Sequence, residues 1–344
     1  MKKYCCEKGK AFLLTDRLTR KYFCGVDVAE GILVITDHFT VFTDARYYSA
    51  AKVNFKSVGV KTHLLKNLSE VSEYLALEGV KELGVDYTKT TVKEFLDYEK
   101  FGFPIFDCSN DIEIIKAIKS DEEIKNIERA CCIVEKAYHS VIKTLKKGIT
   151  ERQVKDRLEE LMTSFGAEGP SFDTIVAFGA NSAVPHHETG DTVLQDNMVV
   201  LIDAGCKVNG YCSDITRTAF YGKPSAEFIN CYNTVKTANE KAICSITDGT
   251  MAKDADAFAR GYLCEQGFGE YFTHSLGHGV GQEIHEFPTV SFKSQATLKN
   301  GMVFTIEPGV YLDGKFGIRI EDTVILLDGK VKRLYSDDKE LIIL

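Results

Sequence analysis

The segment 199-VVLIDAGCKVNGYCSDITRTAF-220 contains two apolar-rich runs joined by the dipeptide Asn209-Gly210. Asn-Gly between such runs is a strong signal for a β-hairpin with a two-residue turn. With that turn, Asp203 and Asp214 project from the same face of the hairpin. A carboxylate inside an apolar strand costs several kcal/mol unless it is paired or bound to a metal. The pattern therefore predicts a charged partner for both aspartates.

The same turn also predicts the strand register. Asp203 is expected opposite Thr216, and Asp214 opposite Gly205, so the two aspartates are diagonal neighbours. Diagonal neighbours on one face lie about 7–8 Å apart at the backbone. Two carboxylates at that distance can bind one species between them.

Two further acidic residues, Glu307 in TIEPG and Glu321 in IRIED, are embedded in apolar runs. If those runs pair across a loop at residues 313–317, both glutamates face the same side. Arg217 and Arg319 are the obvious nearby positive charges, and ion pairs with them alone are one interpretation. Four carboxylates cannot share a dry site without cations, however, which favours metal binding.

The segment 274-HSLGHGVGQEIHEFP-288 holds three of the eight histidines, with glycines alternating between them. Glycines cost about 1 kcal/mol each in a helix interior, so a strand or loop is predicted rather than a zinc-binding helix. The glycines let this backbone approach a metal site without side chains blocking the substrate. One imidazole, His278, with several carboxylates suits two divalent ions that share bridging ligands.

The 344 residues exceed one average domain, and two domains are expected, with a boundary near residues 112–119. The first, residues 1–115, reads as an α/β unit. Its expected elements are a hairpin (32–36 and 39–44), helices (67–79 and 90–102) and strands (82–86 and 104–108).

The second domain, residues 116–344, reads as a repeated order of two helices followed by strands, which indicates a duplicated half around one sheet. Capping boxes at Ser120 and Thr150 open the first two helices, the first of which is expected to end at Gly148. The other expected elements are strands (174–179, 197–208, 211–220), helices (225–246, 252–266) and strands (301–312, 316–326).

Composition excludes several classes of protein. The net charge of −8 and the lack of a Lys/Arg-rich block argue against nucleic-acid binding. The sequence contains no apolar run of 18 residues, so no membrane-spanning helix is predicted. The first residues lack the apolar core of a signal peptide. The eleven cysteines form no C-x-x-C pair, so reduced core cysteines in a cytoplasmic protein are expected.

Five motifs, IDAG, YCSDITRT, GHGVG, TIEPG and GIRIED, occur in an order that closely resembles the pita-bread metallopeptidases. That family comprises methionine aminopeptidase, aminopeptidase P, prolidase and creatinase. KYFCGVDV (21–28) and FTDARYYSAA (42–51) resemble the small N-terminal domain of the proline-specific and creatinase branches. The resemblance implies an α+β chain, with a creatinase-type α/β domain preceding a pita-bread catalytic domain that contains a duplicated half.

The resemblance also implies roles for individual residues. Two divalent ions, manganese first and cobalt or zinc as alternatives, would be held by five ligands: Asp203, Asp214, His278, Glu307 and Glu321. Glu307 would also carry the proton, and Arg319 would position the carboxylates. The substrate-side histidines would be His186, His274 and His285. Structural roles are expected for the other histidines: His38, His63, His139 and His187.

The implied reaction is hydrolysis of the bond before proline, by a dipeptidase or an aminopeptidase P, with a slight preference for the dipeptidase. The substrate is then a peptide with proline in second position, and a homodimer is expected. Methionine aminopeptidase is the alternative enzyme, against which the long N-terminal part argues. A silent binding module is disfavoured because all five ligands are present. Departures at Ala45, Ser275 and Gln282 affect details of the pocket.

Overall fold

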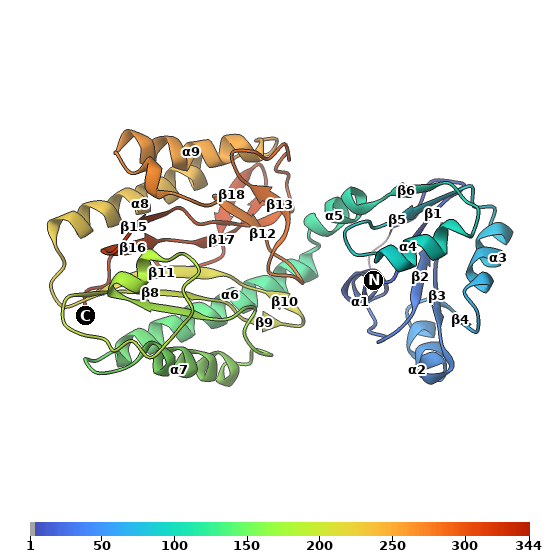
Figure 1. Cartoon of the computed structure of the whole chain (residues 1–344), viewed down its shortest axis with the longest axis horizontal. Coiled ribbons are helices and arrows are strands. Elements are labelled where there is room, and N and C mark those ends of the chain that lie inside the picture. Colours follow the sequence, from blue (N-terminus) through green and yellow to red (C-terminus); the bar gives the residue numbers. More distant parts are fainter. Residues whose placement is uncertain (1–3) are drawn as a thin grey trace. The chain divides into compact units, whose positions relative to one another are not determined.

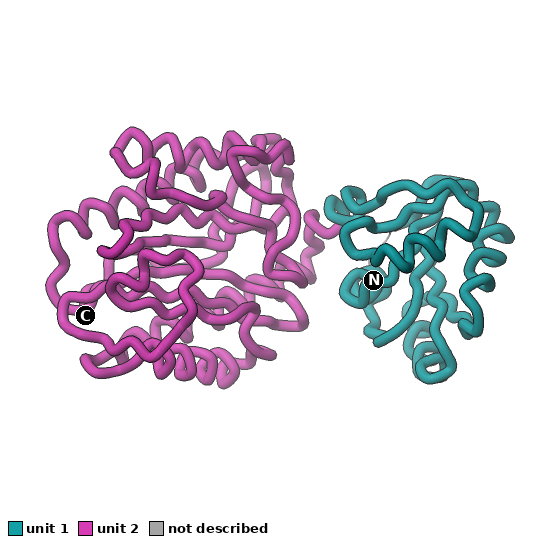
Figure 2. The backbone as a smooth tube through the Cα atoms, in the orientation of Figure 1, with its two compact units in different colours: residues 1–115 teal, residues 116–344 magenta. Residues whose placement is uncertain are grey.

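The structure is a computed structural model that describes residues 4–344. The chain divides into two compact units, the first ending at Ile115 and the second beginning at Lys116 (Figure 2). Each unit has its own hydrophobic cores, two in each. The units are therefore described separately.

The first unit is a six-stranded sheet with the order β4-β3-β2-β1-β5-β6. Its strands are β1 (Lys10–Leu14), β2 (Ile32–Ile35), β3 (Phe39–Thr43), β4 (Lys61–Leu64), β5 (Glu82–Val85) and β6 (Ile105–Asp107). Its helices are α1 (Arg17–Cys24), α2 (Ala45–Lys56), α3 (Ser69–Leu77), α4 (Val92–Glu99) and α5 (Ser109–Ala117), the last of which crosses the boundary. The predicted β2–β3 hairpin is confirmed, with Ile35 opposite Phe39.

Carboxylates cap the first two helices of this unit. Asp16 accepts a hydrogen bond from the Thr19 amide at the start of α1, and Asp44 from the Arg46 amide at the start of α2. These caps satisfy amides that have no partner within a helix. The strands β1 and β4 and the helices α1, α2 and α5 were not among the elements predicted from the sequence.

The second unit has two pairs of helices, one pair on each side of its strands (Figure 1). The pairs are α6 (Asp121–Val141) with α7 (Glu151–Ser164), and α8 (Ala226–Ser245) with α9 (Ala252–Glu265). The capping boxes at Ser120 and Thr150 are confirmed. The prediction that the first helix ends at Gly148 is wrong. It ends at Val141, because the chain beyond it pairs with a distant segment: the Gly148 amide donates to Leu194 O.

The strands of the second unit form four hydrogen-bonded groups, not the single sheet expected. They are β11-β8-β7, β13-β12-β14-β17-β18, β10-β9 and β15-β16. The bounds in the first half are β7 (Ile175–Phe178), β8 (Met198–Ala204), β9 (Lys207–Val208), β10 (Tyr211–Cys212) and β11 (Ile215–Tyr221). Those in the second half are β12 (Gly277–Gly279), β13 (Glu286–Val290), β14 (Val303–Ile306), β15 (Gly309–Leu312), β16 (Phe316–Arg319), β17 (Asp322–Leu327) and β18 (Lys330–Arg333).

The ladders are interrupted where acidic residues lie. Each of the four long strands expected from the sequence is split in two: β8/β9, β10/β11, β14/β15 and β16/β17. The two halves still touch, since the Glu321 amide donates to Thr216 O at 3.1 Å. The break at Glu321 therefore lies where the two halves meet.

Candidate metal centre

The first hairpin has the register that its turn predicts. Asp203 lies opposite Thr216 in the β8–β11 ladder. Asn209 and Gly210 have φ values of 50° and 78°, as a type I′ turn requires at both central positions. Gly205 is required at the break before Asp214, because a Cβ there would lie 2.0 Å from Ser213 O.

The second hairpin brings Glu307 and Glu321 face to face. Ile306 lies opposite Asp322 in the β14–β17 ladder, and Gly309 lies opposite Arg319 in the β15–β16 ladder. The register is the same on both sides of the break, so the two glutamates occupy the gap between the ladders. The predicted pairing of these segments is confirmed, with the loop shortened to residues 313–315.

His278 lies on β12 and points at the acidic residues. Its Nε2 is 3.5 Å from Asp214 Oδ2 and 3.5 Å from Glu307 Oε1. Asp214, His278 and Glu321 each offer a ligand atom, and these atoms lie within 4.8 Å of one another. One atom from each hairpin and one from β12 thus surround a point where a metal ion could bind.

The glycines beside His278 are required for strand packing, and their predicted part in leaving room for substrate stays a prediction. A Cβ on Gly277 would lie 2.0 Å from Thr305 O, and one on Gly279 would lie 2.3 Å from Phe287 O. Backbone atoms cannot move aside as a flexible side chain does. The glycines therefore allow β12 to sit tightly between β13 and β14.

The acidic residues are buried with too little positive charge. Burial raises the pKa of Asp214 and of Glu321 well above the usual range, and repulsion from neighbouring carboxylates adds to the shift. Burial also raises the pKa of Glu307, to about 8. Asp203 Oδ1 is buried and has no hydrogen-bond partner among residues 4–344. An oxygen-rich set of this kind, with one imidazole, fits divalent metal ions.

Arginine pairing alone does not account for the site. Arg319 Nη2 donates to Asp203 Oδ2 at 2.7 Å. Arg217 is used elsewhere, since its guanidinium pairs with Asp322 at 2.8 Å and with Asp337 at 2.6 Å. One arginine thus faces four acidic side chains, and the interpretation that both arginines neutralise the site is wrong.

Arg319 connects several residues that the sequence analysis missed. Its Nε donates to Thr216 Oγ1 at 2.9 Å, and Thr216 Oγ1 donates to Glu321 Oε2 at 2.6 Å. Its Nη1 donates to the Tyr311 hydroxyl at 2.7 Å. Thr216 had a detectable signal, because the predicted register places it opposite Asp203. Tyr311 had none.

Thr305 is a further residue that the sequence analysis missed. Its Oγ1 accepts from the His278 amide at 3.0 Å and donates to Glu307 Oε1 at 3.1 Å. One hydroxyl therefore holds the backbone of one candidate ligand and the side chain of another. Its position two residues before Glu307 on β14 places it on the same face of the strand.

The three histidines predicted to face the substrate differ in their contacts and exposure. The His285 ring lies 4.3 Å from the His278 ring, centroid to centroid. His186 is exposed and lies close enough to Asp203 and His285 to influence the pKa of each. Both are thus placed beside the acidic cluster with an accessible side.

His274 differs because both of its ring nitrogens have partners within the protein. Nδ1 is 2.8 Å from Ser275 O, and Nε2 is 2.8 Å from the Tyr311 hydroxyl. Burial lowers the pKa of His274 to about 3, so the ring is neutral. Because a carbonyl only accepts, Nδ1 carries the proton and Nε2 accepts from Tyr311. In this arrangement His274 offers no N–H to a substrate carbonyl.

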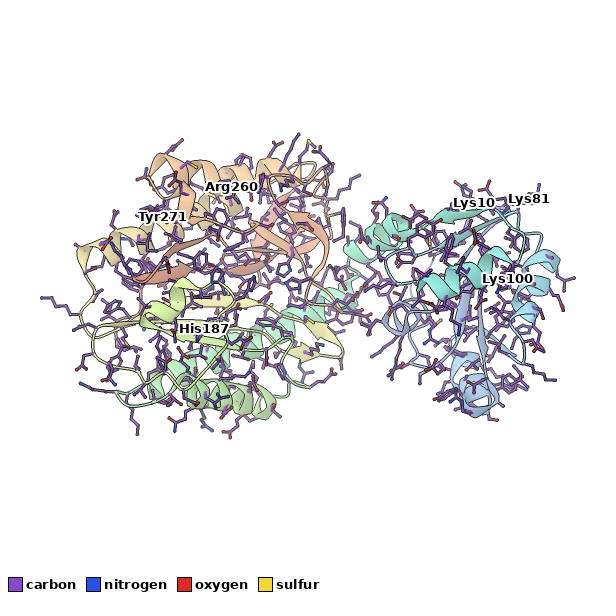
Figure 3. The ribbon with its side chains drawn as sticks, viewed as in Figure 1. Lys10, Lys81, Lys100, His187, Arg260 and Tyr271 are labelled. Atoms are coloured by element: carbon purple, nitrogen blue, oxygen red, sulfur yellow. The ribbon has the colours of Figure 1, made fainter. Side chains whose placement is uncertain are left out.

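His187, the neighbour of His186, is labelled in Figure 3. It has a structural contact, since its Nε2 is 3.0 Å from the buried Glu151 carboxylate. A second cluster, Asp37, His38 and Glu78, has metal-ligand geometry in the first unit. There the Lys61 ammonium lies 2.9 Å from His38 Nε2, which opposes a cation. These contacts agree with the structural roles expected for His187 and His38.

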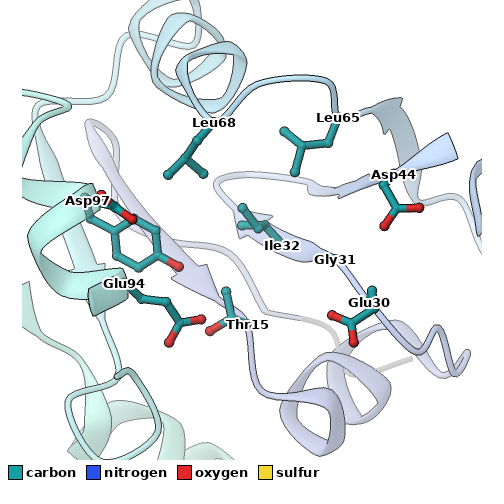
Figure 4. A pocket seen from close by; sticks show the side chains of 10 residues that line it. Thr15, Glu30, Gly31, Ile32, Asp44, Leu65, Leu68, Glu94 and Asp97 are labelled. Atoms are coloured by element: carbon teal, nitrogen blue, oxygen red, sulfur yellow. The ribbon is translucent and has the colours of Figure 1, made fainter. Parts of the chain in front are cut away.

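A cavity of about 310 Å³ in the first unit contains none of the predicted site residues. Figure 4 shows its lining of mixed apolar and acidic side chains: Thr15, Glu30, Gly31, Ile32, Asp44, Leu65, Leu68, Glu94, Asp97 and Tyr98. Three of its acidic side chains have partners within the protein. Asp44 and Glu94 accept hydrogen bonds at the N-termini of α2 and α4, and Asp97 pairs with Lys100. The cavity therefore lacks the converging charge of the cluster around His278.

Comparison with known proteins identifies the class. Residues 125–328 match metallopeptidase family M24, and residues 3–118 match the creatinase/prolidase N-terminal domain. The chain belongs to the M24 metallopeptidases, in their proline-specific branch. This confirms the resemblance, the fold class and the class of enzyme, a metallopeptidase, that the motifs predicted. Members of this family use divalent metal ions.

Three relatives span nearly the whole chain. An Xaa-Pro dipeptidase from Pyrococcus horikoshii is 39% identical and covers 96% of this chain and 94% of its own length. The solved Xaa-Pro dipeptidase from Bacillus anthracis has 34% identity and a TM-score of 0.91, covering 97% of this chain and 95% of its own. The solved X-Pro aminopeptidase from Thermotoga maritima has 32% identity and a TM-score of 0.87, covering 97% of both chains.

Nothing in the described residues suggests insertion in a bilayer through a helix. Residues 4–344 include no helix that is long and apolar enough to cross one.

Proposed function

We propose that this chain is an Xaa-Pro dipeptidase that uses two divalent metal ions. The observation that carries the proposal is the convergence of Asp214, His278 and Glu321, whose ligand atoms lie within 4.8 Å of one another. That convergence occurs in a chain that is 39% identical to a protein named Xaa-Pro dipeptidase. The five proposed ligands are Asp203, Asp214, His278, Glu307 and Glu321.

Manganese is the proposed ion, with cobalt or zinc as alternatives, because hard oxygen ligands dominate the set and no cysteine contributes. When bound, such ions polarise the scissile carbonyl and lower the pKa of water. The unpartnered Asp203 Oδ1 and the raised pKa values of the neighbouring acids support cation binding here.

The chain's own residues would orient the substrate and move protons. Glu307, whose Oε1 accepts from Thr305, would take a proton from the attacking water and return it to the proline nitrogen. That nitrogen belongs to a tertiary amide and carries no proton of its own, so the leaving group depends on this delivery. Arg319 would hold Asp203 directly, and Glu321 through Thr216.

His186 and His285 would face the peptide and donate hydrogen bonds to its carbonyl oxygen. We assign His274 a different role, because its ring nitrogens are engaged by Ser275 and Tyr311. It would fix the Tyr311 hydroxyl, which in turn accepts from Arg319. This chain of hydrogen bonds holds the Arg319 side chain against Asp203.

Dipeptidase is favoured over aminopeptidase P because two relatives with that name match over nearly the whole chain. The X-Pro aminopeptidase likeness keeps the second activity as the alternative. The resemblance to this branch further supports a homodimer. Eleven free thiols suit a reducing compartment, which supports the cytoplasm as the location.

The test is proline release by protein stripped of metal with a chelator. Ala-Pro and Ala-Pro-Ala would be supplied with manganese, cobalt or zinc restored in turn. We expect metal-dependent cleavage of Ala-Pro and little of Ala-Pro-Ala. Release of alanine from the tripeptide would indicate aminopeptidase P, and inactivity on both peptides with every metal would refute the proline-specific proposal.

A further inference from the structure

At the break in the second hairpin, two backbone carbonyls accept hydrogen bonds from a side chain outside the hairpin. They belong to Ile306 and Ile320, the residues that immediately precede Glu307 and Glu321. Both residues are fully buried, so water does not reach these carbonyls. Ile320 lies opposite Pro308, which accepts from the Ile320 amide but has no N–H to donate in return, so the buried Ile320 carbonyl needs a donor from elsewhere. The Ile306 carbonyl lies at the end of the β14–β17 ladder, opposite Asp322.

Asn239 on α8 supplies both donors. Its Nδ2 donates to Ile306 O at 2.8 Å and to Ile320 O at 3.2 Å. The side chain is fully buried. One amide group therefore bridges the two strands directly behind the two glutamates, and uses both of its protons to do so.

Lys339 determines which way the Asn239 amide points. Its Nζ donates to Asn239 Oδ1 at 2.7 Å and to Asp322 Oδ2 at 3.1 Å. An ammonium group only donates, so the oxygen of the amide must face Lys339 and the nitrogen must face the carbonyls. Lys339 is 4% exposed, and Asp322, which is fully buried, balances its charge.

We propose that Asn239, oriented by Lys339, is a positioning residue that sets the spacing of Glu307 and Glu321. The inference rests on the proposed function, in which these glutamates hold metal ions. Each bridged carbonyl belongs to the peptide group that leads into a glutamate, so the amide fixes the orientation of both peptide groups at once. Metal affinity depends on such supporting contacts because ligand oxygens must meet the ion at set distances.

The first variant that tests this proposal is Asn239→Asp. An aspartate has nearly the same shape and can pair with Lys339, but its carboxylate cannot donate to the two carbonyls. Asn239→Leu removes the same donors without adding charge. Tyr232→Phe is the matched control, because Tyr232 lies on the same helix and its hydroxyl donates to Lys339 O at 3.1 Å without touching Ile306 or Ile320.

The measurements are manganese binding by calorimetry and the melting temperature with and without manganese. We expect Asn239→Asp and Asn239→Leu to bind manganese about tenfold or more weakly and to lose most of the metal-induced rise in melting temperature. Tyr232→Phe should melt lower without metal yet keep wild-type affinity within about twofold. A role in folding alone predicts the behaviour of Tyr232→Phe for all three variants.

Affinity within twofold of wild type in either folded Asn239 variant would overturn the inference and leave the proposed function intact. A wild-type chain that binds no manganese, cobalt or zinc would instead overturn the proposed function. Binding to wild type separates these two failures, and it requires no measurement of activity.

Discussion

The two hairpins of the second unit carry the acidic cluster in different ways. Both hairpins are interrupted at the acidic residues and resume the same register beyond the break. In the first hairpin, the aspartates are diagonal neighbours, and only Asp214 lies in the break. In the second, Glu307 and Glu321 lie in the break and face each other.

Different side chains support the two breaks. In the first, Ser213 Oγ accepts from the Cys206 amide at 3.0 Å, and Ser171 Oγ donates to Ser213 O at 2.9 Å. In the second, Asn239 and Lys339 reach in from outside the hairpin. The hydroxyls of Thr323 and Tyr335 also donate to Asp214 O from outside the first hairpin. The first break is thus held by hydroxyl groups, and the second by a buried amide and ammonium from α8 and the C-terminal segment. Equivalent ligand geometry does not require equivalent support.

The largest expected effect comes from replacing a single acidic residue, in one variant from the first hairpin and in another from the second. Asp214→Asn and Glu321→Gln should each lower kcat/KM for Ala-Pro by about 10³-fold, because both side chains meet at the point beside His278. Steady-state kinetics with saturating manganese measures the loss. Asp173→Asn is the matched control, since that side chain is 99% exposed and forms a salt bridge with Lys155. Retained activity in one of the two variants would show that the hairpins do not contribute equally.

An intermediate effect is expected at the first break. Gly205→Ala places a Cβ 2.0 Å from Ser213 O and 2.2 Å from Ser171 Oγ. Because the nearer atom is backbone, the strands must separate, at a cost of about 2–3 kcal/mol in the free energy of unfolding. Urea denaturation of the metal-free protein measures this change. A cost below about 1 kcal/mol would mean that the first break is pliable.

The smallest effect is expected at the two turns, where the hairpins should behave alike. Gly210 and Gly314 have φ values of 78° and 69°, so alanine at either position is strained by about 1 kcal/mol. Gly261 lies inside α9, with no atom within 4 Å of an added Cβ. Gly261→Ala should raise stability by about 0.5–1 kcal/mol in the same urea titration. If alanine at Gly210 or at Gly314 left the protein as stable as wild type, the expectation that the two turns behave alike would be wrong.

The sequence predicted the local features of the candidate site well. The Asn209-Gly210 turn carried the register that places Asp203 opposite Thr216, because a two-residue turn leaves one pairing for the strands that follow it. The strand or loop character of the segment around His278 followed from its glycines. The functional roles of the acids and histidines stay predictions until the variants are measured.

Element ends were predicted less well. The first helix of the second unit stops at Val141, and four expected strands are split. Four of the eleven cysteines, Cys5, Cys132, Cys244 and Cys264, are exposed rather than in the core. In each case the local sequence allows the longer element or the buried position, and contacts with distant segments decide otherwise.

The sequence by itself determined how the first hairpin pairs and that the chain resembles metallopeptidases, and it predicted which residues form the candidate site, because turn geometry and strand alternation act over a few residues. The tertiary structure alone decided how those residues are supported. Asn239 lies 67 residues before Ile306 and 100 before Lys339, and Tyr311 meets His274 from 37 residues away. No local pattern links such positions, since their hydrogen bonds arise only after the helices and strands have packed.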